Sequence, residues 1–157
     1  MVQVLFVCLG NICRSPTAEG VFWHLVEGQG LADQIGIDSA GTSGWHIGEG
    51  PDPRAQAAAD KRGYDLSRLR GRQVQPADFS TFDYIIAMDD SNHTSLSAMA
   101  PSGEQNRIHM FLAFAPETGI REIPDPYYGA GDGFGTVLDL IEAASRGLLE
   151  DIRQKHL

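Results

Sequence analysis

The residues best suited to carry out a chemical reaction lie near the N-terminus, where five residues separate Cys8 from Arg14. A cysteine thiolate is a nucleophile, and the planar Arg guanidinium can bind two oxygens of a tetrahedral oxyanion. If the intervening residues wrap into a ring, their N–H groups point inward and form an anion-binding nest at the start of a helix. The nest would favour the thiolate, and the hydroxyl of Ser15 can donate to the sulfur. This spacing predicts that Cys8 attacks the phosphorus of a bound phosphate group.

Two residues of this loop suit a tightly wound backbone. Gly10 allows the backbone to take a positive φ and to approach its ligand closely. Asn11 is the residue type that next best tolerates a left-handed conformation. Both residues therefore support a loop whose N–H groups converge.

Each feature alone has an ordinary explanation. A lone cysteine after an apolar strand is usually a small buried hydrophobe, and a glycine-containing loop before a helix is a weak signal. The loop lacks the Gly-Lys-Ser/Thr ending of a Walker A loop, and Cys8 and Cys13 lack the spacing of thioredoxin-like centres. What favours a phosphate loop is the conjunction of Cys8, Arg14, Ser15 and Pro16 at a strand-to-helix junction.

The hydrophobic pattern predicts the elements that position this loop. Residues 2–7 are an apolar, β-branched run typical of a fully buried strand. Ser15 and Pro16 are expected to be the N-cap and first residue of a helix that ends at Gly28 and Gly30. Further strands are expected over residues 35–40, 82–88 and 107–112, and further helices over residues 54–62, 90–99 and 135–154.

This alternation of strands and helices predicts an α/β fold. We expect a four-stranded parallel sheet flanked by helices on both faces, with the phosphate loop after the first strand. Ligands of such sheets bind at the carboxyl ends of the strands, where this loop lies. No repeat or linker divides the chain, so residues 1–157 are expected to form a single domain.

Composition excludes several classes of protein. The chain has 157 residues, with 12 Lys and Arg against 21 Asp and Glu, and its formal net charge is −9. This balance argues against binding to nucleic acid or to an anionic membrane, because both require a positive field. With two cysteines, no signal peptide and no long apolar run, the protein is expected to be cytoplasmic, without membrane insertion. The scattered histidines and the spacing of the two cysteines offer no metal site, and no cofactor is expected.

The segment from Val7 to Glu19 resembles the signature of the low-molecular-weight protein tyrosine phosphatases. Residues 38–42, 45–48, 52–54, 84–89 and 125–128 also resemble family segments in family order, so the resemblance covers nearly the whole chain. It implies a metal-independent phosphatase in which Cys8 is the nucleophile, Arg14 binds the phosphate and Asp125 is the general acid and base. The remaining positions of the implied phosphate loop are Leu9, Gly10, Asn11, Ile12, Cys13 and Ser15.

The implied reaction has two steps. Cys8 attacks phosphorus while Asp125 protonates the leaving phenol, which gives a phosphocysteine, and the same carboxylate then activates the water that releases phosphate. An acid is needed because a tyrosyl oxygen leaves more easily when it is protonated. Spacing alone does not select Asp125, whose setting between two prolines is also typical of a plain turn.

The resemblance also indicates the class of phosphoester. Trp45, Tyr127 and Tyr128 resemble the aromatic residues of the family's substrate cleft, and Leu9 and Ile12 resemble its apolar walls. A deep apolar slot prefers a flat aryl phosphate to the shorter phosphoserine, although packing in the core is the alternative for Trp45. The implied partners are phosphotyrosine-containing proteins, with a bacterial tyrosine autokinase or host phosphoproteins as candidates.

Relatives with a similar loop provide the competing hypotheses. Arsenate reductases use further cysteines downstream, and none follows Cys13 here. Phosphoarginine phosphatases tend to carry a small polar residue in place of Ile12. Ile12 and the pair Tyr127-Tyr128 therefore favour phosphotyrosine, and phosphoarginine hydrolysis is the alternative. A non-catalytic phosphotyrosine-binding module fits less well because Cys8, Arg14 and Asp125 are all present, and a redox protein would leave the last two without roles.

Two positions raise separate questions. Cys13 is either a small core-facing residue or the partner of Cys8 in a reversible disulfide that protects the nucleophile from over-oxidation. Leu69 stands where the family usually has a histidine that supports the phosphate loop by hydrogen bonds. Because Leu69 cannot donate a hydrogen bond, the support of the loop is expected to differ here.

Overall fold

Four parallel strands form a sheet at the centre of the protein. The structure is a computed structural model that describes residues 1–128 and 133–157, without the side chain of Tyr128. The strands lie in the order β2-β1-β3-β4. Their bounds are Val2–Cys8 for β1, Ile35–Gly41 for β2, Tyr84–Ala87 for β3 and Ile108–Met110 for β4. The predicted α/β class and four-stranded parallel sheet are confirmed.

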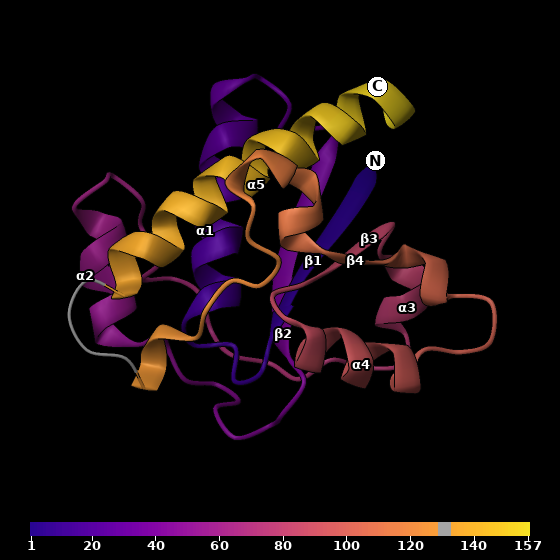
Figure 1. The fold of residues 1–157 in the computed structure, drawn as a ribbon, viewed down its shortest axis with the longest axis horizontal. Helices are drawn as coiled ribbons and strands as arrows, with labels where there is room; N and C mark the ends of the chain where they lie inside the picture. Colours follow the sequence, from indigo (N-terminus) through magenta and orange to yellow (C-terminus); the bar gives the residue numbers. More distant parts are fainter. Residues whose placement is uncertain (129–132) are drawn as a thin grey trace.

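Helices cover both faces of this sheet, as predicted (Figure 1). Helices α1 and α5 pack against each other on one face, with α2 beside them, and α3 and α4 lie on the other face. The bounds of the helices are Arg14–Gly28 for α1, Pro53–Asp60 for α2, Asp78–Thr81 for α3, Asp90–Met99 for α4 and Gly133–His156 for α5. Short 3-10 helices span Gln105–Arg107, Phe111–Phe114, Pro116–Thr118 and Pro126–Tyr128.

The central strand β1 is buried on both of its faces, as its apolar sequence predicts. Successive side chains of a strand point to opposite faces of the sheet. Phe6 and Cys8 accordingly belong to the hydrophobic cluster under α1 and α5, whereas Leu5 and Val7 belong to the cluster on the face of α3 and α4. The strand is therefore fixed between two cores, and its last residue, Cys8, is held with it.

The order of the strands reverses between β1 and β3. From β1 the chain crosses to β2 on one side, whereas β3 pairs with the other side of β1 and leads to β4. The loops that follow two such strands run apart and leave a crevice at their carboxyl ends. The segments that follow Cys8 and Ala87 therefore lie next to each other at one edge of the sheet.

The start of α1 differs from the prediction. The helix begins at Arg14 with Cys13 as its N-cap, so Ser15 is not the N-cap but a residue of the first turn. The Ser15 hydroxyl is bonded to side chains of the preceding loop instead of capping the helix. Pro16 is tolerated in the first turn because an N–H there has no partner within the helix.

Other boundaries move by a few residues. The strand predicted over residues 82–88 is limited to Tyr84–Ala87, and the one predicted over 107–112 to Ile108–Met110 because Phe111–Phe114 turns into a 3-10 helix. The helix predicted over residues 54–62 ends at Asp60, and the final helix extends beyond 135–154 at both ends. Helix α3 was not predicted, because four residues are too few to show a hydrophobic period.

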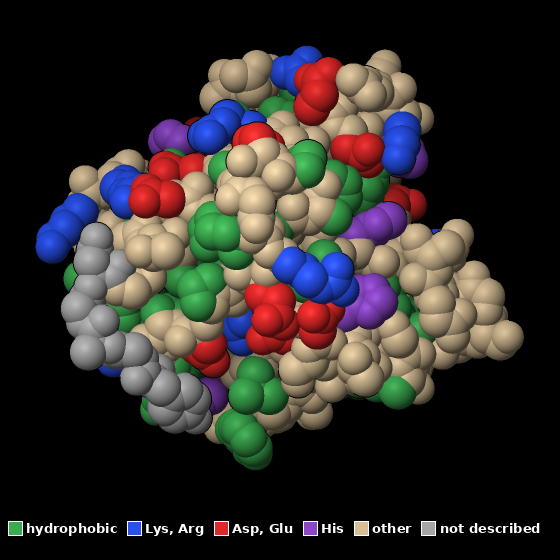
Figure 2. Space-filling view, in the orientation of Figure 1, with side chains coloured by type: hydrophobic (Ala, Val, Ile, Leu, Met, Phe, Trp, Pro, Cys, Tyr) green, Lys and Arg blue, Asp and Glu red, His purple; other side chains and the backbone are tan. Residues whose placement is uncertain are grey.

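Charged side chains are mixed on the surface shown in Figure 2. Lys and Arg side chains on this face lie singly or beside Asp and Glu side chains. Arg62, for example, pairs with Asp139 and Glu142, and Arg121 pairs with Asp90. This face therefore offers no continuous basic patch of the kind that a nucleic acid would require. None of the helices in the described part of the chain has the long apolar stretch that a membrane span needs.

Gly147 of α5 provides a test of how closely the helices pack on the sheet. A Cβ added at Gly147 would lie 1.7 Å from the backbone oxygen of Phe114. Gly147→Ala should therefore lower the free energy of unfolding by about 1–3 kcal/mol, although alanine favours a helix by about 1 kcal/mol over glycine. Urea unfolding would measure this difference.

The matched control is Gly28→Ala at the end of α1. A Cβ added at Gly28 meets no atom within 4 Å, so this variant should be neutral or slightly more stable than the wild type. Equal urea midpoints for the two variants would contradict the packing described here.

Candidate active site

The loop between β1 and α1 is bound on its outer side by the segment that follows β2. Its backbone carbonyls accept hydrogen bonds from that segment: Cys8 from Thr42 at 2.9 Å, Leu9 from Ser43 at 3.0 Å and Ile12 from Asp52 at 2.8 Å. Within the described residues, by contrast, no acceptor bonds the backbone N–H groups of residues 10–13. With the carbonyls turned outward, these N–H groups and the positive end of the α1 dipole can bind an anion inside the loop.

Cys8 lies at the base of this loop. Only 3% of the residue is exposed, and its Sγ lies 3.0 Å from the Oγ of Ser15. The first turn of α1 thus places the hydroxyl where it can donate to a thiolate, as the sequence suggested.

Asn11 fixes the shape of the loop. It is the one non-glycine residue with a positive φ, of 57°, in the described part of the chain. Its amide nitrogen donates to the hydroxyls of Ser15 at 2.8 Å and Ser39 at 3.0 Å, and its carbonyl accepts from the N–H of Arg72 at 3.0 Å. All three bonds run to buried or partly buried groups, so they offset the strain of the left-handed conformation.

Gly10 does not adopt the positive φ that glycine allows, and the left-handed position falls on its neighbour. A Cβ at Gly10 would instead lie 3.1 Å from Cδ2 of His46. Glycine is therefore suited to this position because the imidazole packs closely on the loop backbone.

Arg14 is held by two acceptors from other segments. Its guanidinium NH1 donates to Asp89 Oδ2 at 2.7 Å and to the carbonyl of Ile123 at 2.9 Å. Asp89 is itself fixed as the N-cap of α4, where its Oδ1 accepts from the N–H of Asn92 at 2.8 Å. The side chain of Arg14 is only 3% exposed, so its guanidinium is fixed in orientation before any anion binds.

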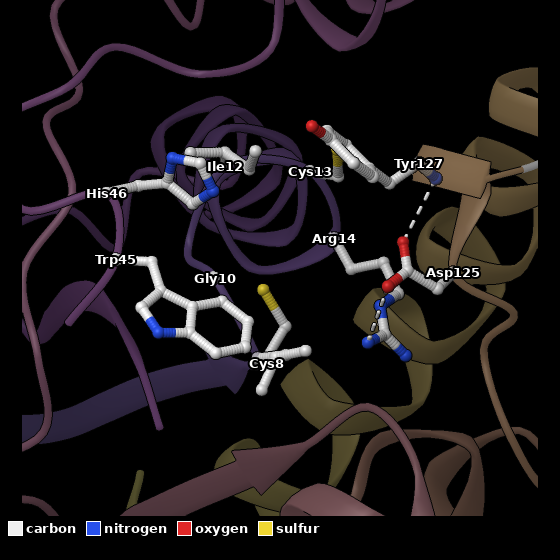
Figure 3. A pocket seen from close by; sticks show the side chains of 10 residues that line it. Cys8, Gly10, Ile12, Cys13, Arg14, Trp45, His46, Asp125 and Tyr127 are labelled. Atoms are coloured by element: carbon white, nitrogen blue, oxygen red, sulfur yellow. Dashed lines mark hydrogen bonds and ion pairs between the residues drawn. The ribbon is translucent and has the colours of Figure 1, made fainter. Parts of the chain in front are cut away.

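Asp125 lies on a loop that reaches the same pocket from the other side. Its Oδ1 accepts a hydrogen bond from the N–H of Tyr127 at 3.0 Å, and its Oδ2 lies 3.6 Å from NH2 of Arg14. Pro124 and Pro126 on either side restrict the backbone. Figure 3 shows the carboxylate of Asp125 and the sulfur of Cys8 facing one space.

Aromatic side chains stand at the entrance of this pocket. Trp45 is 72% exposed and lines the pocket together with Tyr127, so packing of Trp45 in the core is ruled out. Tyr128 was expected in the cleft, but its side chain lies outside the described part of the structure. The residues that line the pocket are Cys8, Leu9, Gly10, Ile12, Cys13, Arg14, Trp45, His46, Asp125 and Tyr127.

Three residues at the site were not singled out from the sequence. His46 lines the pocket, and its Nδ1 is 2.8 Å from Oε2 of Glu49. Arg54 bonds Asp52 and lies over the ring of Tyr127, 5.4 Å from its centroid. The third is Asp89, for which a signal existed: an aspartate that caps a helix directly after a strand lies at the carboxyl edge of the sheet, where ligands bind.

Cys13 is buried, and neither it nor Cys8 is in a disulfide. Burial raises the pKa of the Cys13 thiol to about 12, and the Asp52 carboxylate raises it further in the same direction. Cys13 therefore stays protonated at neutral pH and is a poor nucleophile in this state.

Leu69 is half-buried and lines a second cavity behind the phosphate loop. The loop is supported without it, because Asn11 is bonded to Ser39 and the Ser39 hydroxyl donates to Oε1 of Glu19 at 2.6 Å. The support that was in doubt from the sequence thus comes from Ser39 and the partly buried Glu19.

The comparisons with known proteins agree with one another. The model of the family described as "Low molecular weight phosphotyrosine protein phosphatase" matches residues 3–157. A low molecular weight protein-tyrosine-phosphatase of Streptomyces coelicolor is 44% identical over 156 residues, which are 98% of this chain and 94% of that protein.

Solved structures are similar over the same length. The crystal structure of YfkJ from Bacillus subtilis has a TM-score of 0.95 at 41% identity and covers 100% of this chain and 98% of that chain. The crystal structure of a Drosophila arginine phosphatase has a TM-score of 0.91 at 33% identity and covers 98% of this chain and 99% of that chain. Similarity at this level over nearly the whole chain shows that the protein belongs to the low molecular weight phosphotyrosine protein phosphatase family.

Proposed function

We propose that this protein hydrolyses phosphotyrosine in proteins through a phosphocysteine on Cys8. One observation carries the proposal: a thiol, a fixed guanidinium and a carboxylate, those of Cys8, Arg14 and Asp125, line one pocket around inward N–H groups. A phosphate group bound by those N–H groups and by Arg14 would lie directly over the sulfur.

In the first step, the thiolate of Cys8 attacks phosphorus in line with the bond to the tyrosyl oxygen. The S–P bond forms as the P–O bond breaks, and Asp125 transfers its proton to the departing phenolate. The inward N–H groups and Arg14 stabilise the charge on the three equatorial oxygens. The hydrogen bond that Arg14 donates to Asp89 keeps the guanidinium in place during this step.

In the second step, water attacks the phosphocysteine. Asp125, now a carboxylate, takes a proton from the water, the O–P bond forms and the S–P bond breaks. Cys8 leaves as a thiolate, which the Ser15 hydroxyl stabilises by its hydrogen bond to the sulfur. The products are inorganic phosphate and the free enzyme.

The entrance of the pocket favours an aryl phosphate. Trp45 and Tyr127 offer flat aromatic surfaces, and Leu9 and Ile12 supply apolar walls. Phosphoarginine hydrolysis is the second candidate because the Drosophila arginine phosphatase is structurally similar. The substrates are phosphoproteins, and a tyrosine kinase that carries phosphotyrosine is a candidate among them.

The covalent mechanism is tested with p-nitrophenyl phosphate. Cys8→Ser should lower kcat by at least about 10⁴-fold, because the nucleophile is lost. Asp125→Asn should lower it by about 10²- to 10⁴-fold, because the leaving group is no longer protonated.

Calorimetric titration with inorganic phosphate is the control for Cys8→Ser, which keeps the N–H groups and Arg14 and should still bind phosphate. Undiminished turnover in this variant would exclude the phosphocysteine.

Ile12 tests the choice between phosphotyrosine and phosphoarginine. The wild type should hydrolyse a phosphotyrosine peptide with a kcat/KM at least about tenfold higher than that for the matched phosphoarginine peptide. Ile12→Ser should narrow this ratio, because it removes an apolar wall of the pocket.

The control is Ile47→Ser, which removes an equally apolar, 60% exposed side chain that does not line the pocket. It should leave the ratio unchanged. A preference for phosphoarginine in the wild type would reject the proposed specificity.

Cys13 is proposed as the redox partner of Cys8. Peroxide would oxidise the Cys8 thiolate to a sulfenic acid. The protonated Cys13 thiol would then form the S–S bond as its proton passes to the departing sulfenic hydroxyl, which leaves as water. Peroxide-treated wild type should regain most of its activity with dithiothreitol, whereas Cys13→Ser should regain less, because its sulfenic acid proceeds to the sulfinic acid. Mass spectrometry checks for the disulfide, and equal recovery of both proteins would reject this role.

A further inference from the structure

A second cavity lies behind the phosphate loop, between α1 and the segment that follows α2. Its volume is about 540 Å³, within the range typical of small-molecule sites. It shares no lining residue with the pocket of Cys8. Trp23, Ile37, Tyr64 and Leu69 supply apolar and aromatic surface to its walls. Its charged or titratable side chains are the acidic Glu19 and Asp65, together with Arg68 and His24.

Glu19 is the acidic group of this cavity that is connected by hydrogen bonds to the phosphate loop. Its Oε1 accepts a hydrogen bond from the Ser39 hydroxyl at 2.6 Å, and no donor among the described residues bonds its Oε2. Burial raises the pKa of Glu19 to about 7, and the neighbouring Asp38 raises it in the same direction. Leu69 on the wall of the cavity offers no hydrogen bond. A cation in the cavity would therefore stabilise the carboxylate.

The aromatic walls suit the same ligand. Trp23 is 52% exposed although it lines the cavity, and the ring of Tyr64 is held in place by an edge-to-face contact with His24 and a hydrogen bond to Glu142. Aromatic faces attract cations and pack against apolar groups. The charge and the walls together fit an ammonium group attached to an apolar ring.

Four hydrogen bonds connect this cavity to the nucleophile. The Ser39 hydroxyl donates to Glu19, and the Asn11 amide donates to both Ser39 and Ser15. The Ser15 hydroxyl lies 3.0 Å from the sulfur of Cys8. A charged Glu19 can only accept, so it fixes the Ser39 hydroxyl as the donor of their hydrogen bond, while the Ser39 oxygen accepts from Asn11. The protonation state of Glu19 therefore affects the hydrogen bonds of Asn11, the residue that gives the loop its shape.

We propose that this cavity is a second ligand site, which takes a small organic cation with its ammonium group against Glu19 and its apolar part against Trp23 and Leu69. We further propose that occupation of this site strengthens the binding of phosphate in the loop, because it holds the Glu19–Ser39–Asn11 hydrogen bonds in one direction. Binding of the cation does not depend on the proposed function, and the coupling requires only that the loop binds phosphate.

The first experiment measures binding to the wild type by calorimetry at pH 6 and pH 8. The probe is 2-phenylethylamine, with 2-phenylethanol and 3-phenylpropionate as neutral and anionic analogues. Only the amine should bind, and about tenfold more tightly at pH 8, since a carboxyl with a pKa of about 7 ionises over this range. Other titratable or charged groups around Glu19 are Asp38, Arg72, His24, Tyr64, Asp65 and Arg68. Equal binding of the three probes, or none, would overturn the site.

Variants assign the binding to this cavity. Glu19→Gln keeps the other titratable groups, so it should bind the amine about tenfold more weakly at pH 8 and lose most of the pH dependence. Trp23→Ala removes an exposed side chain without disturbing the core and should weaken binding about fivefold. The matched control is Trp45→Ala at the other pocket, which should bind the amine as the wild type does. If Trp45→Ala weakens binding and Trp23→Ala does not, the amine binds elsewhere and the proposal fails.

The coupling is measured with inorganic phosphate, so it needs no turnover. At pH 6, a saturating concentration of 2-phenylethylamine should tighten phosphate binding about fivefold, and phosphate should tighten amine binding by the same factor. Glu19→Gln should show no such change even when the amine is saturating. Phosphate affinity that is the same with and without the amine in the wild type would overturn the coupling.

Discussion

The hydrogen bonds of the Asn11 side chain are the interaction on which the rest of the site depends. The N–H groups of a loop converge only if one residue turns left-handed, and here that residue is Asn11, with a φ of 57°. A single side chain then bonds Ser15, Ser39 and the backbone of Arg72, so three separate segments hold the loop in this shape. Because the protein carries a net charge of −9, only such a local concentration of donors can attract a phosphate dianion.

The sheet order explains how distant residues come to share the pocket. Cys8 ends β1, and Asp89 follows β3 by way of Met88, so the two lie on either side of the reversal in strand order. Arg14 joins them, because its NH1 is bonded both to Asp89 and to the carbonyl of Ile123, whose N–H is bonded to Met88. The segment that leads to Asp125 is thereby tied to the carboxyl end of β3. The guanidinium of Arg14 and its acceptors thus help to bring Asp125 to the pocket that Cys8 lines.

The sequence was sufficient to predict features that rest on local pattern. The apolar run of β1, its position between helices and the loop that ends in Arg14 follow from periodicity and residue type. The function of Ser15 was predicted in part: its contact with the sulfur is present, but it does not cap the helix. A hydroxyl in the first turn can bond either the helix or the loop, and only the folded loop decides which.

Features that depend on long-range packing could not be predicted. The positive φ falls on Asn11 and not on Gly10, and the Asn11 side chain is bonded to Ser39 and to the backbone of Arg72, which are distant in the sequence. The acceptors of Arg14 come from residues that follow it by 75 and 109 positions, and no spacing in the sequence indicates such a contact. The position of Asp125 in the pocket also depends on long-range packing, and only the family resemblance selected this residue from the sequence. Local sequence thus predicts the loop from Cys8 to Ser15, whereas tertiary contacts decide which other residues meet it, Asp125 among them.

Leu69 illustrates how one side chain behind the loop affects the hydrogen bonds that support the loop. A leucine cannot donate to Glu19, so the carboxyl is bonded by the Ser39 hydroxyl and is otherwise enclosed by a cavity with apolar walls. Burial without a second donor raises the pKa of Glu19 to about 7, which makes its charge sensitive to whatever enters that cavity. The same carboxyl is four hydrogen bonds from the sulfur of Cys8. With a leucine at position 69, the loop is therefore supported through Asn11, Ser39 and Glu19, and this support includes a carboxyl whose charge a proton can change.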